Sequence, residues 1–147
     1  MPSAKHSVVI ERPVSEVFAY VIDGTTAPTW RPSCIDVRLA SGTPGQVGAR
    51  YEQGLKGPGG RIAGDYELSE VMPNKVIAFK VVAGPARPQG RYEFTPEGGG
   101  TRVTFALNWE PKGIKENLMA PMVARTMPGE VATLDNLKRV LEGRPPA

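Results

Sequence analysis

One histidine and one cysteine, His6 and Cys34, are the residues of the chain best suited to metal or nucleophilic chemistry. A Cys₂His₂ zinc site needs two of each, and a histidine-rich site needs several, so the sequence predicts no metal site. A Ser-His-Asp triad would have to use His6, which we expect to be exposed or frayed at the edge of the first strand. No local signature connects Cys34 to a base, and a lone cysteine is usually a small hydrophobe, so we do not expect it to be reactive.

Two glycine-rich segments, residues 42–48 and 57–60, are candidates for phosphate-binding loops. Neither fits the pattern G-x-x-x-x-G-K-[ST], and neither precedes a predicted helix. Hairpin turns explain both segments. The sequence also predicts no cofactor.

The charge is modestly basic, with 18 Lys and Arg against 15 Asp and Glu, a net charge of +3 and a pI near 9.2. The basic residues stand singly or in pairs such as Lys138-Arg139, usually near an acid such as Asp135 or Glu142. They form no stripe of the kind that follows a phosphate backbone, so we expect no nucleic-acid partner.

The composition, with 40% hydrophobic and 22% charged residues, is that of a globular domain. The longest apolar runs span a few residues, which excludes a transmembrane helix and stable membrane insertion. The first six residues lack the apolar core of a signal peptide, and the lone Cys34 cannot form an intramolecular disulfide. We therefore expect a cytoplasmic protein with one domain, residues 1–147.

The chemistry-bearing residues must be positioned by the elements that the hydrophobic pattern predicts. Residues 5–11 alternate as a strand does, and residues 14–22 show the apolar spacing of an amphipathic helix that begins after Pro13. Residues 25–33 contain Pro28, Trp30 and Pro32, which favours one irregular helical turn.

Six strands at hairpin spacing follow, separated by Gly, Pro and Asn clusters, so we expect an antiparallel sheet. Their predicted ranges are 35–40, 49–55, 61–71, 76–82, 90–95 and 101–109. One face of this sheet is apolar by alternation: Ile62, Tyr66, Leu68, Ile77, Phe79, Val81, Tyr92, Phe94, Val103, Phe105, Leu107 and Trp109.

The cover for this face must come from the C-terminal segment. Apolar residues recur there at helical spacing between Met119 and Leu141. Pro128-Gly129 predicts a kink or break, with the better-formed helix over residues 130–142.

This order of elements resembles the helix-grip fold of the START-like (SRPBCC) superfamily. The signature most similar to its polyketide cyclase/dehydrase-like branch is Val8-x-Ile10-x-Arg12-Pro13-x-x-x-Val17-Phe18-x-x-Val21-x-Asp23, followed by Pro28-x-Trp30-x-Pro32. The resemblance implies an α+β fold, in which a curved antiparallel sheet of about seven strands wraps around a long C-terminal helix. It also implies two short helices between strands 1 and 2, and a START-like ligand-binding domain.

A sheet wrapped around one helix leaves a cavity, which in ligand-binding proteins measures on the order of 300–1,000 Å³. We expect it to bind or transport a small hydrophobic or amphipathic molecule such as a lipid, a polyketide or a quinone-like compound. The alternative is that the same residues simply pack against one another as a core. The candidate ligand-binding residues are Trp30, Tyr66, Phe79, Tyr92, Phe105, Trp109, Met119, Met122 and Val123.

Two other functions are open. The first is a polyketide aromatase/cyclase, with Tyr66 and Tyr92 as weak acids or hydrogen-bond donors, Arg50 or Arg91 as an anion stabiliser and Glu52 as a base. Alternation places Arg91 opposite to Tyr92, toward solvent.

The second is a protein-interaction module using an exposed Trp30, although we favour Trp30 as a cap over the mouth of the sheet. A homodimer is compatible with each function.

Overall fold

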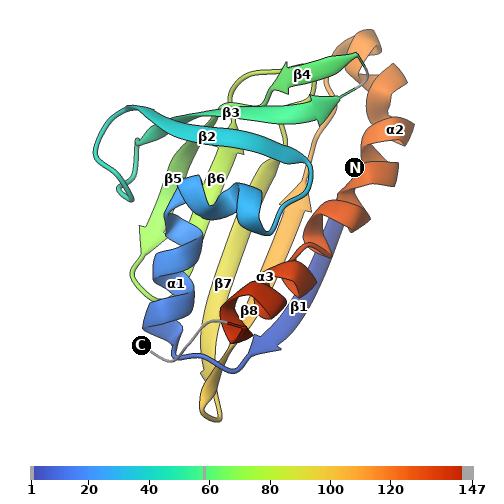
Figure 1. Cartoon of the computed structure of the whole chain (residues 1–147). Helices are drawn as coiled ribbons and strands as arrows, with labels where there is room; N and C mark the ends of the chain where they lie inside the picture. The colour runs from blue at the N-terminus through green and yellow to red at the C-terminus, as the bar shows by residue number, and fades with distance from the viewer. Residues whose placement is uncertain (1, 58, 144–147) are drawn as a thin grey trace.

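The computed structural model describes residues 2–57 and 59–143, in twelve helices and strands (Figure 1). In chain order these are β1 (Ser3–Ile10), α1 (Val14–Ile22), the 3-10 helix η1 (Gly24–Thr29), β2 (Cys34–Ser41), β3 (Arg50–Gly57), β4 (Gly60–Ala63), β5 (Tyr66–Met72), β6 (Val76–Val81), β7 (Gln89–Glu97), β8 (Gly100–Asn108), α2 (Gly113–Val131) and α3 (Leu134–Glu142). Among these helices, none combines the length and the hydropathy needed to cross a membrane.

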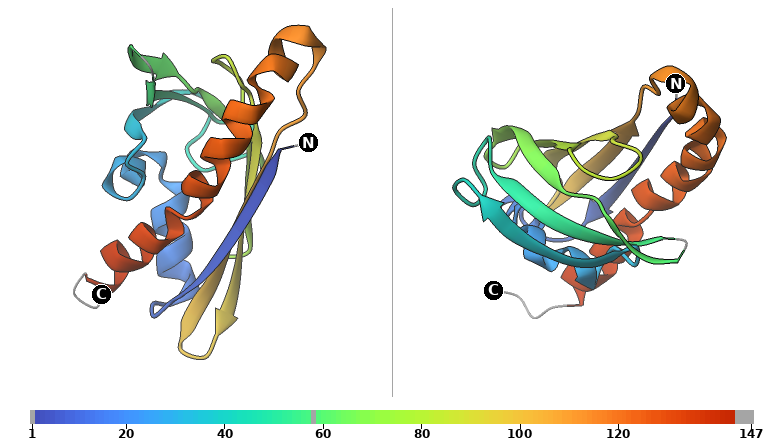
Figure 2. Two further views of the ribbon diagram at one scale, coloured as in Figure 1. Left: turned by 90° about the vertical axis from the view of Figure 1, so that its right-hand side faces the viewer. Right: turned by 90° about the horizontal axis from the view of Figure 1, so that it is seen from above.

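All strand pairs are antiparallel, in the order β1-β8-β7-β6-β5-β3-β2, and β4 pairs with β3 beside this path. The sheet curves strongly, and α2 and α3 lie against its concave side (Figure 2). The helices α1 and η1 cover the part of that side left open by α3. The predicted α+β helix-grip fold, with two short helices between strands 1 and 2, is therefore confirmed.

The predicted single strand over residues 61–71 is wrong in one respect, because the structure divides it into β4 and β5. Gly64 lies at the division, where its N–H donates to the carbonyl oxygen of Gln53 at 2.8 Å. A Cβ at Gly64 would stand 2.5 Å from Cδ1 of Leu55. Only glycine fits this close approach. The break separates β4, which pairs with β3 alone, from β5, which pairs with both β3 and β6.

The break in the C-terminal helix lies later than predicted. The helix α2 continues through Pro128, which is exposed, and ends at Val131. The break falls at Ala132-Thr133, where the Thr133 hydroxyl donates to the carbonyl oxygen of Glu130. A proline on the outer side of a helix can leave its freed carbonyl to water, whereas a threonine that bonds back to the previous turn competes with the helical pattern.

Polar contacts fasten α3 to the first strand. The Nε2 atom of His6 lies 2.9 Å from Oδ1 of Asp135. The prediction of an exposed or frayed His6 is therefore wrong, because the residue is half-buried and lies in the paired part of β1. The Glu142 carboxylate accepts from the backbone N–H of Glu11 at 2.8 Å and from Lys138 at 2.7 Å. These contacts hold the end of the chain over the core.

The core fills the space between the concave face and the helices. Three leucines of α3, Leu134, Leu137 and Leu141, are fully buried, as are Ile10 of β1 and Val17 of α1. Their spacing places all three leucines on one side of α3, which faces the sheet. This end of the molecule is a packed core, and the less tightly filled space lies toward η1.

Candidate functional site

A pocket lies between the concave face of the sheet and the segment from the end of α1 to β2. The segment contributes Val21, Ile22, Gly24, Ala27, Trp30 and Arg31, and the sheet contributes Gln53, Tyr66, Leu68, Ile77, Phe79 and Tyr92. Four of the nine candidate residues therefore line one pocket: Trp30, Tyr66, Phe79 and Tyr92. Because the η1 segment forms one wall, the pocket faces η1 and not α2.

Aromatic rings form the sheet side of this pocket. Tyr66 stacks on Tyr51 with ring centroids 5.1 Å apart, and Phe79 meets Tyr66 edge-on at 5.7 Å. Tyr92 stacks on Phe105 at 4.1 Å. Each strand from β3 to β8 except β4 supplies at least one ring, since inward positions alternate along every strand. The rings build a continuous apolar wall of large area.

Trp30 covers this wall from the η1 side. Its ring meets Tyr92 edge-on at 6.3 Å, its side chain is 4% exposed, and its carbonyl oxygen accepts from Asn136 of α3 at 3.1 Å. An exposed contact surface at Trp30 is therefore ruled out, and the prediction that it caps the mouth of the sheet fits. Its buried Nε1–H has no hydrogen-bond partner within residues 2–57 and 59–143.

Arg31 brings a positive charge to the apolar pocket. Its Nη1 donates to Oε1 of Gln53 at 2.8 Å, and Nη2 lies 3.7 Å from a carboxylate oxygen of Glu130 in α2. The guanidinium Nε is buried and has no hydrogen-bond partner in the part of the chain that the structure describes. An arginine that is only 17% exposed and has one orphaned donor is a site to which an oxygen acceptor would be attracted.

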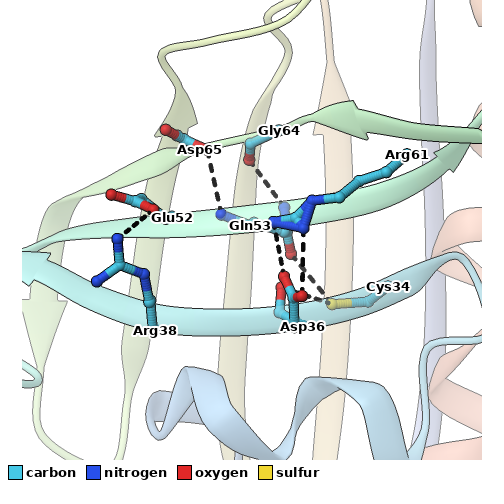
Figure 3. A network of polar contacts seen from close by, with 8 residues as sticks. All are labelled: Cys34, Asp36, Arg38, Glu52, Gln53, Arg61, Gly64 and Asp65. Carbon is cyan, nitrogen blue, oxygen red and sulfur yellow. Dashed lines mark hydrogen bonds and ion pairs between the residues drawn. The ribbon is translucent and has the colours of Figure 1, made fainter.

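A polar network behind the pocket fixes Gln53, which is 4% exposed (Figure 3). Its Nε2 donates to the carbonyl oxygen of Gly64 at 2.9 Å, and its backbone N–H donates to Asp65 at 3.2 Å. The Sγ of Cys34 lies 3.7 Å from Oε1. These partners set the orientation of the amide, so Oε1 faces Arg31.

Burial raises the pKa of the Cys34 thiol, as expected of a structural cysteine.

The two phenols of the pocket are hydrogen-bond donors at neutral pH. Burial raises the pKa of both Tyr66 and Tyr92, and the positive charge of Arg31 opposes this rise in each case. Neither hydroxyl has a hydrogen-bond partner among the described residues. The pocket thus gathers four donor groups, from Trp30, Arg31, Tyr66 and Tyr92, in apolar surroundings.

The pocket is nearly filled by its own side chains. Its free volume is about 40 Å³. This is room for only a few water molecules. The expectation of a cavity of on the order of 300–1,000 Å³ is therefore wrong for this conformation. Any larger ligand must displace side chains, and among the lining residues Ile22, Tyr66 and Phe79 are half-buried.

A second, open groove of about 380 Å³ adjoins the pocket on the other side of Ile22. Ile22 is the one residue common to both linings. The other lining residues of the groove are Phe18, Gly45, Gln46, Val47, Val71 and Pro73. Ile22 therefore stands between the two spaces.

The remaining predicted residues lie elsewhere. Phe105 and Trp109 are buried in the sheet wall, at 2% and 3% exposure, and Val123 is buried at 8%. Met119 is half-buried, whereas Met122 is 52% exposed. The part of these residues in ligand binding stays a prediction.

The charged candidates for catalysis lie outside the pocket. Arg50 pairs with Glu67 at 3.0 Å and Arg91 pairs with Glu70 at 2.7 Å, in agreement with the predicted outward position of Arg91. Glu52 pairs with Arg38 at 2.7 Å. Since Tyr51 is buried, its neighbours on β3 face outward, as alternation requires.

Sequence reasoning missed Arg31 and Gln53. The sequence does carry a signal for Gln53, because it lies two residues after Tyr51 on β3 and so points to the same face of the sheet. Arg31 follows η1 in an irregular segment, where no periodicity predicts the direction of a side chain. No three His, Cys, Asp or Glu side chains cluster as a metal site in the described part of the chain.

The helix-grip arrangement, with a pocket between sheet and helices, defines a START-like (SRPBCC) domain. The sequence matches the family model described as polyketide cyclase / dehydrase and lipid transport over residues 1–142, and the chain belongs to this family. No curated protein matches the sequence. Family and fold together support a role in ligand binding or polyketide cyclisation.

Solved structures show the same fold. TTHA0849 from Thermus thermophilus is similar with a TM-score of 0.79 at 22% identity, over 98% of this chain and 100% of that one. DR_A0006 from Deinococcus radiodurans has a TM-score of 0.69 at 20% identity, over 97% and 98%. BexL, a di-domain ARO/CYC protein of the BE-7585A biosynthetic pathway, has a TM-score of 0.71 at 18% identity, over 96% of this chain and 48% of BexL.

Proposed function

We propose that the chain binds and carries a small amphipathic molecule, lipid-like, polyketide-like or quinone-like, with an apolar body and at least one oxygen acceptor. The observation that carries this proposal is the pair of buried donors without partners, Trp30 Nε1 and Arg31 Nε, at a pocket whose walls are otherwise aromatic and aliphatic. The family membership of the chain supports it.

The energetics favour a ligand with oxygen atoms. A buried donor without an acceptor costs about 1–3 kcal/mol. A carbonyl or carboxylate oxygen placed beside Trp30 and Arg31 would recover this cost, and the aromatic wall would bury the apolar body. A pure hydrocarbon would be buried against the aromatic wall in the same way, but it would leave Trp30 and Arg31 without a hydrogen bond.

The nearly filled pocket implies that binding changes the structure. A ligand that enters from the groove beside Phe18 and Val47 has to displace Ile22, which borders both spaces. Movement of the half-buried Phe79 would then open the pocket along the sheet. The free protein is in this view the closed form.

A polyketide cyclase is the second candidate, favoured by Arg31 acting electrostatically on two phenols and by the family of the chain. The guanidinium would stabilise an enolate, and a phenol would supply a proton. Because the pKa of each phenol is raised, both stay protonated at neutral pH and are weaker acids than a free tyrosine, which makes them hydrogen-bond donors more than proton donors. This favours holding a ligand over protonating it. A cytoplasmic location and a homodimer stay predictions from the sequence.

Native and denaturing mass spectrometry of the purified protein tests the proposal. We expect a small molecule that is retained in the native spectrum and lost on unfolding, and Arg31→Gln should retain less of it. Oleate and 1,4-naphthoquinone, added to the protein, serve as probes if purification removes the natural ligand. The proposal is wrong if neither probe nor a natural compound is retained by a folded protein.

A further inference from the structure

The first half of α2 carries an apolar stripe that no part of the described chain covers. Ile114, Leu118 and Met122 are 83%, 77% and 52% exposed. Their spacing of four residues places them on one side of the helix. The opposite side, with Val123 and Met127, is buried against the sheet and the core. This helix therefore has two apolar faces, of which one is in water.

Basic side chains surround the exposed stripe. Lys112, Lys115 and Arg125 are exposed, and none of them pairs with a carboxylate within the described residues. On the outer face of the sheet, Arg50 and Arg91 pair with glutamates, whereas the exposed Lys5 and Lys56 form no ion pair among the described residues.

Acidic side chains are few beside the stripe. Between positions 110 and 129 of the sequence the acidic residues are Glu110, which is exposed, and Glu116, which is half-buried and accepts from the backbone N–H of Lys112 at 3.0 Å. The exposed side of this segment is therefore apolar and positively charged.

The stripe stands at an end of the molecule. The first turns of α2 extend past the end of β1, so a flat surface can approach them (Figure 2, left). The helix is anchored by its later turns, where Met127 and Val131 are each 3% exposed. The packing of these later turns therefore keeps the helix in place when its first turns contact another surface.

We propose that this face of α2, defined by Ile114, Leu118, Met122, Lys112, Lys115 and Arg125, docks the protein on an anionic lipid bilayer. A helix with an apolar side flanked by lysine and arginine lies in the interface of such a membrane, with its apolar side chains among the acyl chains. The cations pair with lipid phosphates and with anionic headgroups.

A second copy of the chain fits the same face less well. Three aliphatic side chains offer on the order of 300 Å² of apolar surface, whereas a stable dimer buries about 800 Å² per partner. Two copies of this face would also bring the three cations of each chain together. A bilayer needs no such area and supplies the opposite charge.

The proposal goes beyond ligand binding and does not depend on it, although docking at a bilayer would bring the pocket to a source of amphipathic ligands. The two are separable in experiment, because vesicle binding is measured on the protein without added ligand, and ligand retention is measured without vesicles.

Sedimentation with vesicles tests the docking. We expect the protein to sediment with phosphatidylcholine vesicles containing phosphatidylglycerol, and to remain in solution with phosphatidylcholine alone or at high salt. Ile114→Ser with Leu118→Ser should abolish binding, and each of Lys112→Gln, Lys115→Gln and Arg125→Gln should weaken it roughly fivefold. The matched controls are Ile35→Ser, a 40% exposed isoleucine of β2, and Lys75→Gln, an exposed lysine of the β5–β6 turn.

Three results would overturn the proposal: a wild-type protein that stays in solution with anionic vesicles, a stripe variant that binds as the wild type does, or controls that lose binding equally. Size-exclusion chromatography with light scattering adds a further outcome. If the wild type is a dimer that Ile114→Ser with Leu118→Ser converts to a monomer, a second copy covers the stripe and the bilayer does not. Circular dichroism establishes that each variant is folded.

Discussion

The guanidinium of Arg31 meets the amide of Gln53 across one side of the pocket, with Nη1 donating to Oε1 at 2.8 Å. The two residues come from different elements, the end of the η1 segment and the middle of β3. The Nε2 of Gln53 donates to the carbonyl oxygen of Gly64, which turns the amide oxygen, its only side-chain acceptor, toward Arg31. The contact holds the guanidinium beside the aromatic wall while its Nε stays without a partner.

Arg31→Gln should reduce the affinity for an oxygen-bearing ligand by roughly 10- to 100-fold, since a hydrogen bond to a charged group contributes about 1.5–3 kcal/mol. Titration of the protein with oleate or 1,4-naphthoquinone measures the change. The control is Arg38→Gln, which removes an exposed arginine paired with Glu52 and should leave the affinity unchanged. Equal losses in both variants would place the effect outside the pocket.

Tyr66→Phe and Tyr92→Phe separate the carrier from the cyclase. In a carrier, each change removes one donor and should lower ligand affinity by less than about tenfold. In a cyclase, loss of the proton donor should lower turnover by roughly 100-fold or more. Binding and product formation measured on the same two variants decide between the functions, and a large loss of turnover with intact binding would reject the carrier.

Gly90→Ala should destabilise the protein by about 1–3 kcal/mol, because a side chain has to be inserted into a packed wall. A Cβ at position 90 would stand 2.2 Å from the ring of Phe79. Gly99→Ala is the matched control, since nothing lies within 4 Å of its Cβ and the change should stay within about 0.5 kcal/mol. Urea unfolding measures both, and equal midpoints would show that Phe79 moves freely.

Leu137→Ala should cost about 2–5 kcal/mol of unfolding free energy, as expected for a fully buried leucine. Leu118→Ala, at 77% exposure in the preceding helix, should change it by no more than about 0.5 kcal/mol. Thermal or urea unfolding of the two variants tests the burial of α3. A small effect of Leu137→Ala would mean that α3 does not pack on the sheet as described.

Acid should loosen the contact between α3 and β1. Hydrogen bonds from Lys138 and from the backbone N–H of Glu11 hold the pKa of Glu142 below its ordinary value of 4.5. A carboxyl group whose pKa is lowered by folding stabilises the protein above its unfolded pKa, and this contribution is lost as the pH falls through the folded pKa. Solvent still reaches Glu142, whose side chain is 29% exposed, so the effect should be modest.

Glu142→Gln should therefore remove part of the stability loss seen between neutral pH and about pH 3. Urea midpoints of the wild type and the variant across this range measure it. If both proteins lose stability in parallel, Glu142 does not contribute in the way its contacts indicate.

The hydrophobic pattern was sufficient for the strands, since alternation in β6, β7 and β8 reports which face is buried. It was insufficient at Gly64 and at Thr133, where one close contact or one hydroxyl hydrogen bond decides how an element ends. Both effects depend on a single contact, which does not change the hydrophobic periodicity of the sequence.

The candidate site was predictable only in part. Tyr66, Phe79 and Tyr92 share a parity on neighbouring strands, which brings their rings together. Arg31 has no such regularity around it. The exposure of Met122 was also unpredictable, because α2 is apolar on two sides and its sequence does not say which of them meets the sheet.

The NMR signal of the Trp30 indole N–H tests the proposed site most directly, because this N–H is one of the two buried donors of the pocket that lack a partner among the described residues. The chain has two tryptophans, so a ¹⁵N-labelled sample gives two indole signals, which Trp109→Phe assigns. On addition of a retained ligand or probe that carries an oxygen acceptor, the Trp30 proton signal should move downfield, as a new hydrogen bond requires, while that of Trp109 changes little. A ligand that binds tightly and leaves the Trp30 signal in place would contradict the proposed site.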